Sequence, residues 1–209
     1  MKIDPDAVLW SAPERERAGR PLLVLLHGFG SHEGDLFALS PGLPLEPVIA
    51  SLRAPLTAGP GNAWFPLSAD TAPDDLEGLA DAAAQAVLDW LDTTQSTSVG
   101  ILGFSQGGAT ALQLLRLAPE RFAYTVVLAG FVVGANHPGD AHLAELKPPV
   151  FWGRGTADTR IPKPAIDWTA VWLPEHADAT IRIYEELGHG ISPDELKDFV
   201  TFMRKHLAA

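Results

Sequence analysis

The chain has 209 residues, of which 46% are hydrophobic and 20% are charged, a composition typical of a globular protein with a sizeable core. Its formal net charge of -11 makes nucleic acid and anionic membranes unfavourable partners, because both repel an acidic surface. The lack of cysteine excludes disulfides, thiolate metal sites and a cysteine nucleophile, and it fits a reducing compartment.

The amino terminus, Met1–Asp6, carries acids and has no long apolar stretch, so we expect no signal peptide. No apolar run approaches membrane-spanning length. We therefore expect a single domain over residues 1–209, a cytoplasmic location and no stable membrane insertion. The oligomeric state is left open by the sequence, with a homodimer as one option.

Apolar runs predict the strands of a sheet. Residues 22–26 are apolar at every position, which is typical of a strand buried on both faces of a parallel sheet. Further strands are predicted, in chain order, at residues 7–10 (an edge strand), 48–52, 98–102, 124–133, 150–153 and 181–187.

Helices are predicted between these strands. Apolar residues recur at helical spacing over 76–91, and Ser192, Pro193 and Glu195 form a capping box at the start of the final helix. Strands alternating with helices predict an α/β fold with a mostly parallel sheet and helices on both faces. Other helices are expected at 33–39, 109–117 and 165–173, and loops at 55–61 and 134–149.

Ser105 stands in Gly103–Gly108, a G-x-S-x-G motif between a predicted strand and a predicted helix. Such a turn strains the serine backbone and points its hydroxyl out of the sheet. Side chains at Gly103 and Gly107 would collide in so tight a bend. The motif predicts that Ser105 is a nucleophile, although a Gly-rich turn can also be only a tight connection.

A serine nucleophile needs a base, and the base needs an orienting acid. His189 follows the carboxyl end of a predicted strand, the edge where chemistry collects in open α/β sheets. His27 also follows a buried strand, but we expect it to be a structural hydrogen-bonding residue. Asp158 follows the strand at 150–153 in the order Ser, acid, His that the motif requires. The competing acids are Asp140, Asp167 and Asp178.

Backbone donors must face the carbonyl oxygen as it becomes negative. We expect one from the N–H of Gln106 and one from the N–H of Phe29, in the loop after the first long strand. The alternative is that this loop is a plain Gly-rich turn. The connection at 134–149 is too short for a cap domain, so we expect an open groove. The residues expected to flank it are Phe29, Trp64, Phe65, Leu56 and Val132, although aromatic residues in such a pattern can equally be core.

Together these segments resemble the small phospholipase/carboxylesterase family of the α/β-hydrolase fold, which includes acyl-protein thioesterases. The resemblance implies a Ser105–His189–Asp158 triad, an oxyanion hole from Phe29 and Gln106, and a place beside the site for Trp64-Phe65. Where the family usually has Asp after Trp-Phe, this chain has Pro66. The segments that carry the resemblance are Leu26–Gly30, Asn62–Phe65, Gly103–Ala109, Gly155–Pro162 and Gly188–Gly190.

These features predict a serine carboxylesterase, with no metal and no cofactor, that hydrolyses short- to medium-chain acyl esters through an acyl-enzyme intermediate. An acyl-protein thioesterase or a lysophospholipase is the alternative, since no residue distinguishes oxygen from sulfur leaving groups. Acyl transfer to another alcohol or to peroxide would use the same intermediate. The non-enzymatic alternative is a catalytically silent hydrolase fold that binds a small ligand.

Overall fold

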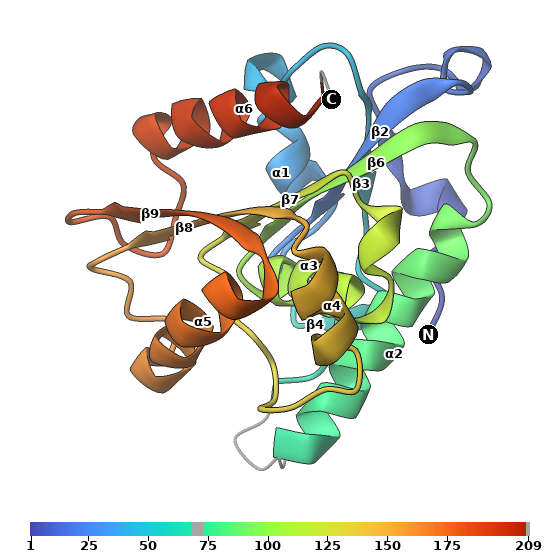
Figure 1. Ribbon diagram of the computed structural model, residues 1–209. Helices are drawn as coiled ribbons and strands as arrows, with labels where there is room; N and C mark the ends of the chain where they lie inside the picture. The colour runs from blue at the N-terminus through green and yellow to red at the C-terminus, as the bar shows by residue number, and fades with distance from the viewer. Residues whose placement is uncertain (68–72, 208–209) are drawn as a thin grey trace.

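Seven strands form the central sheet of the computed structural model, which describes residues 1–67 and 73–207 (Figure 1). The strand order is β1-β3-β2-β6-β7-β8-β9, and every neighbouring pair is parallel except β1 with β3. The strands are β1 (Leu9–Trp10), β2 (Arg20–Leu26), β3 (Val48–Leu52), β6 (Ser96–Phe104), β7 (Tyr124–Leu128), β8 (Pro149–Gly155) and β9 (Asp178–Tyr184). A separate hairpin pairs β4 (Leu56–Ala58) with β5 (Gly61–Ala63).

Helices cover both faces of this sheet (Figure 1). The α-helices are α1 (Gly34–Phe37), α2 (Pro73–Leu91), α3 (Gln106–Leu117), α4 (Asp140–Leu146), α5 (Lys163–His176) and α6 (Pro193–Leu207). Four short 3-10 helices are η1 (Pro5–Ala7), η2 (Glu14–Glu16), η3 (Ser40–Gly42) and η4 (Pro119–Arg121). Helices α1 and α6 lie on one face, and α2, α3, α4 and α5 lie on the other. None of the helices described has both the length and the apolar character needed to cross a bilayer.

The continuous apolar run of β2 serves two hydrophobic cores. Leu22, Val24 and Leu26 pack into the core beneath α2 and α3, whereas Leu23 and Leu25 pack into the core beneath α1 and α6. Successive side chains of a strand point to opposite faces, so a sheet covered on both sides needs apolar residues at every position. The prediction of a parallel sheet covered on both faces is confirmed.

Several predicted boundaries differ from those of the structure. Strand β7 ends at Leu128, five residues earlier than expected, because Ala129 has a positive φ of 46° and turns the chain. Strand β9 lies three residues earlier than the predicted 181–187, and Glu186 (φ 59°) turns the chain after it. Hairpin β4–β5 and helix α4 occupy segments that were expected to be loops.

Strand β9 is the outermost strand beside β8. None of its seven residues is buried, and Ile183 is 52% exposed. Strands β3 and β2, near the other side of the sheet, differ from β9. Most residues of β2 and all residues of β3 are buried.

Candidate active site

Ser105 occupies the sharp turn between β6 and α3. Its backbone has φ 54° and ψ -116°, outside the regions that L-residues favour, and it is the N-cap residue of α3. The turn is held by hydrogen bonds on both sides, since the Ser105 N–H donates to Leu128 O at 2.8 Å and the Ala109 N–H donates to Ser105 O at 3.0 Å. The strained conformation is therefore fixed by the surrounding backbone, as expected where strain serves a site.

Two glycines allow this turn to pack against the sheet. A Cβ added at Gly103 would lie 2.2 Å from the Gly107 carbonyl oxygen, and one at Gly107 would lie 1.9 Å from the Leu26 carbonyl oxygen. Both obstacles are backbone atoms, which cannot rotate away as a flexible side chain can. The spacing of the motif is thus required by the close approach of α3 to β2.

The structure brings His189 to Ser105 and Asp158, the three residues predicted from the sequence. The Nε2 atom of His189 lies 3.0 Å from Ser105 Oγ, and its Nδ1 atom lies 2.7 Å from Asp158 Oδ2. With the proton on Nδ1, the imidazole donates to the carboxylate and accepts from the serine hydroxyl. The Phe104 ring packs against the imidazole at a centroid distance of 4.9 Å.

Asp158 lies in the turn after β8, and its side chain is only 2% exposed. Its second oxygen, Oδ1, accepts hydrogen bonds from the N–H of Arg160 at 2.8 Å and of Ile161 at 3.3 Å. Burial raises the pKa of Asp158, but the hydrogen bonds from His189 and from these two N–H groups outweigh it and hold the pKa below its usual value. The carboxylate therefore stays ionised beside the imidazole.

The loop after β2 that contains Phe29 begins at His27, whose ring nitrogens both contact backbone groups. His27 is fully buried; its Nδ1 lies 2.7 Å from Gly28 O, and its Nε2 accepts from the Ala54 N–H at 3.1 Å. Burial lowers the pKa of His27, which keeps the ring neutral, so this histidine has a structural role.

Two backbone N–H groups near Ser105 are free to donate. Among residues 1–67 and 73–207, neither the Phe29 N–H nor the Gln106 N–H donates to another protein group. Gln106 is the first residue of α3, where N–H groups have no intrahelical partner. These are the two donors that the sequence suggested for an oxyanion hole.

A cavity of about 750 Å³ opens beside the triad, within the range of small-molecule sites. Ser105, His189, Phe29 and Gln106 line it. Its other walls are largely apolar and include Leu67, Leu76, Phe131, Val132 and Ile161. Helix α4, the helix between β7 and β8, packs against α3 and α5 and contributes no residue to this lining.

Of the residues expected to flank the groove, the structure places Phe29 and Val132 in its wall. Trp64, Phe65 and Leu56 are not among the lining residues. The side chains of Trp64 and Phe65 are completely buried, and Trp64 Nε1 donates to His27 O at 2.8 Å. Trp64 therefore supports the Phe29 loop from within the core. Leu67, Leu76, Phe131 and Ile161 also line the cavity, and the sequence carries no local signal for this because their positions depend on how distant segments meet.

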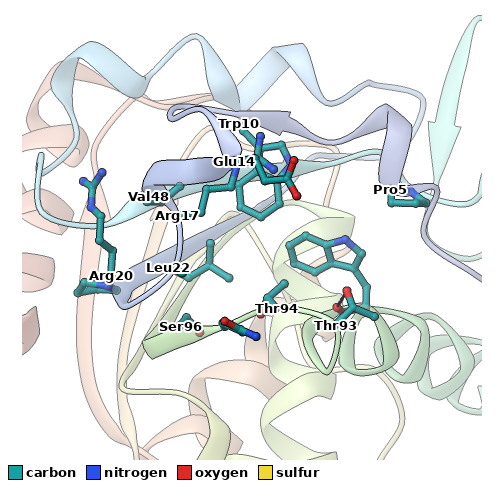
Figure 2. Close-up of a pocket in the computed structure, with 14 residues that line it drawn as sticks. Pro5, Trp10, Glu14, Arg17, Arg20, Leu22, Val48, Thr93, Thr94 and Ser96 are labelled. Atoms are coloured by element: carbon teal, nitrogen blue, oxygen red, sulfur yellow. Dashed lines mark hydrogen bonds between the residues drawn. The ribbon is translucent and has the colours of Figure 1, made fainter.

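A second cavity, of about 530 Å³, lies at the opposite edge of the sheet, where β2, β3 and β6 begin (Figure 2). Figure 2 shows Trp10, Arg17 and Glu14 on one side of it and Thr93 and Thr94 on the other. The Arg17 guanidinium already stacks on Trp10 at 4.0 Å and donates to Ala12 O. No member of the triad lines this cavity, so the candidate active site is the cavity at the carboxyl edge.

Comparison with solved structures identifies the fold as that of an α/β-hydrolase. The crystal structure of esterase PE8 superimposes with a TM-score of 0.78 and 26% sequence identity, covering 98% of this chain and 99% of that one.

The chain belongs to the phospholipase/carboxylesterase family, whose family model matches residues 12–207. Carboxylesterase SOBER1 of Arabidopsis thaliana is 27% identical, covering 90% of this chain and 91% of its own length. Acyl-protein thioesterase 1 of Eremothecium gossypii is 25% identical, with coverage of 93% and 92%. The protein is accordingly a hydrolase that acts on ester bonds.

Proposed function

We propose that the protein is a serine carboxylesterase that hydrolyses short- to medium-chain acyl esters through an acyl-enzyme. The observation that carries the proposal is the continuous hydrogen-bonded arrangement of Ser105 Oγ, His189 and Asp158, with distances of 3.0 and 2.7 Å. Such an arrangement allows a hydroxyl to lose its proton as it attacks a carbonyl carbon.

In the proposed mechanism, Ser105 Oγ attacks the ester carbonyl while His189 Nε2 takes its proton. The N–H groups of Phe29 and Gln106 stabilise the negative oxygen of the tetrahedral intermediate. His189 then gives the proton to the leaving alcohol, and the acyl group remains on Ser105. A water molecule, deprotonated by His189, attacks this ester, and His189 returns the proton to Ser105 Oγ as the acid is released. Asp158 keeps the proton of the neutral ring on Nδ1 and stabilises the imidazolium.

The cavity supports the choice of substrate. Its volume of about 750 Å³ and apolar walls suit an acyl chain of short to medium length, and α4 contributes no residue to its lining. An acyl-protein thioesterase or lysophospholipase activity is the second candidate, favoured by the similarity to acyl-protein thioesterase 1. Both candidates use the same nucleophile and differ in leaving group.

Hydrolysis of p-nitrophenyl esters from acetate to decanoate tests the nucleophile. We expect Ser105→Ala to lower kcat/KM by at least about 10⁴-fold, because the acyl-enzyme cannot form. Ser96→Ala is the matched control. Ser96 is the first residue of β6, the strand that Ser105 follows, so the change removes a hydroxyl at the far end of that strand. Equal hydrolysis by Ser105→Ala and the wild type would overturn the proposal and favour a silent ligand-binding fold.

A matched pair of oxygen and thio esters separates the two candidates. An esterase should have the higher kcat/KM on the oxygen ester, and a thioesterase should reverse that order. Labelling of Ser105 by a fluorophosphonate, measured in parallel, reports whether the nucleophile is active whichever leaving group is preferred.

A further inference from the structure

The side chain of Gln106 is buried beneath the candidate site and uses both ends of its amide. Its Oε1 accepts from the Trp64 N–H at 3.0 Å, and its Nε2 donates to the Phe65 carbonyl at 2.6 Å. The residue is 1% exposed, so water does not compete for either bond. The first residue of α3 is thus joined to a segment about 40 positions earlier in the chain.

That segment in turn holds the Phe29 loop. The Asn62 N–H donates to Ser31 O at 2.7 Å, and the Gly30 N–H donates to Asn62 O at 2.8 Å. On the other side of Phe29, Trp64 Nε1 donates to His27 O at 2.8 Å. Residues before and after Phe29 are therefore both fixed to the segment that the Gln106 amide binds.

The two N–H groups of the site that have no partner in the described part of the chain lie at the two ends of this network. One belongs to the backbone of Gln106, and the other belongs to Phe29. We propose that the Gln106 side chain is a positioning residue that sets the separation of the two oxyanion donors. This inference rests on the proposed function and adds a determinant of its rate.

The chemistry requires an amide. Trp64 presents an N–H and Phe65 presents a carbonyl, so the side chain must accept at one atom and donate at the other. Methionine has a similar length but makes neither bond. An ionised glutamate accepts only and is repelled by the Phe65 carbonyl, whereas a protonated glutamate can both accept and donate. Burial raises the pKa of such a carboxyl, which extends its protonated range.

Steady-state kinetics of Gln106→Met test the inference. Loss of one oxyanion donor costs about 10²–10³-fold in kcat, and a misplaced donor should cost part of this, about 10–100-fold. We expect this fall in kcat with KM within twofold of wild type. The Ki of an acyl trifluoromethyl ketone, whose adduct carries an oxyanion, should rise in parallel with the fall in kcat/KM.

Gln113→Met is the matched control. Gln113 lies on the same helix, is also 1% exposed and also uses its amide, which donates to Asp81 and accepts from Arg116. It should lower stability without changing kcat or the Ki of the ketone. Equal losses of kcat in Gln106→Met and Gln113→Met would overturn the inference in favour of general loosening of α3.

Gln106→Glu supplies a second readout that does not depend on the methionine variant folding. Its kcat relative to wild type should rise at least fivefold as the pH falls from 8 to 5.5, and dividing by the wild-type value cancels the pH effects that both enzymes share. A flat ratio, or a kcat of Gln106→Met within threefold of wild type, would overturn the inference. If wild type hydrolyses esters and Ser105→Ala does not, such a result refutes only the role of Gln106.

Discussion

Three side chains from separate loops make one hydrogen-bonded unit at the residue scale. Ser105 follows β6, Asp158 follows β8 and His189 follows β9. The turns after β8 and β9 are themselves joined, because the Ala157 N–H donates to Leu187 O at 3.0 Å. A backbone bond therefore helps to fix the position of Asp158 relative to His189.

We expect Asp158→Asn to lower kcat by about 10³–10⁴-fold, because an amide cannot hold the imidazole in the tautomer that accepts the serine proton. Asp167→Asn is the matched control, since Asp167 is an exposed acid of α5 paired with Lys163. Steady-state hydrolysis of one p-nitrophenyl ester by both variants measures the effect. Losses below tenfold in Asp158→Asn would show that Asp158 is not the orienting acid.

The three residues predicted as a triad lie within hydrogen-bonding distance of one another, whereas only Phe29 and Val132 of the residues expected along the groove line the cavity. Order along the chain and position after strands single out Ser105, Asp158 and His189 without any knowledge of contacts. Trp64 and Phe65 were expected at the groove but lie in the core, because an aromatic residue after a loop has the same pattern in either place. The bonds of the Gln106 amide span more than 40 residues and leave no local signal.

At the element scale, the first turn of helix α6 contains a buried carboxyl group, that of Glu195. The Glu195 N–H donates to Ser192 Oγ at 3.1 Å, as the predicted capping box requires. The Glu195 carboxyl, however, is fully buried and packs against Gly153, where an added Cβ would lie 2.2 Å from Oε1. Neither carboxyl oxygen has a hydrogen-bond partner among the residues described.

Burial, with a smaller contribution from Asp198, raises the pKa of Glu195 to about 7. The folded protein therefore binds this proton more tightly than the unfolded chain, whose carboxyl has the ordinary value of 4.5. The contribution to the free energy of unfolding is full below about pH 4.5, falls as the pH rises, and is lost above about pH 7. Its size is at most roughly 3 kcal/mol.

Urea unfolding of wild type and Glu195→Gln at pH 5 and pH 8 tests this dependence. Relative to wild type, the variant should gain about 1–3 kcal/mol in free energy of unfolding between the two pH values, because glutamine does not ionise. Asp194→Asn, an exposed neighbour, should show no such change. A pH-independent difference between Glu195→Gln and wild type would contradict the shifted pKa.

The elements found from the sequence were those with a strong local signal. Buried runs such as residues 22–26 and 48–52 contain no polar residue except Ser51, and helix α2 repeats apolar residues over five turns. Hairpin β4–β5 and helix α4 were missed, because strands of three residues and a helix of seven are too short for periodicity to appear. The early end of β7 depends on the positive φ of Ala129, and alanine has no sequence signal for that conformation.

At the scale of the whole molecule, the carboxyl ends and the amino ends of the sheet strands differ in function. The carboxyl edge carries Ser105, Asp158 and His189 and the cavity beside them, whereas the cavity at the amino edge is walled by residues that contact one another (Figure 2). There the ring centroids of Trp10 and Trp90 lie 5.8 Å apart, and the Arg17 guanidinium stacks on the Trp10 ring. These contacts attach the short strand β1 to α2 and stabilise the fold far from the chemistry.

Trp10→Ala should therefore separate stability from activity. We expect a loss of about 1–3 kcal/mol in free energy of unfolding, because the ring is partly exposed and only part of its packing is lost. The kcat/KM for a p-nitrophenyl ester should stay within twofold of wild type at 25 °C. Urea unfolding and steady-state kinetics measure both, and a tenfold loss of kcat/KM in the folded variant would show that the two edges are coupled.

His189, the proposed base, follows the end of β9, which has a sheet partner on one side only and no buried residue. Fraying of that outer strand would carry the imidazole away from the hydroxyl while the inner strands stayed paired. Heat or urea should then abolish catalytic activity before the rest of the molecule unfolds. The rate at which the enzyme loses activity would then depend on the opening of the edge strand β9 and not on the cooperative unfolding of the core.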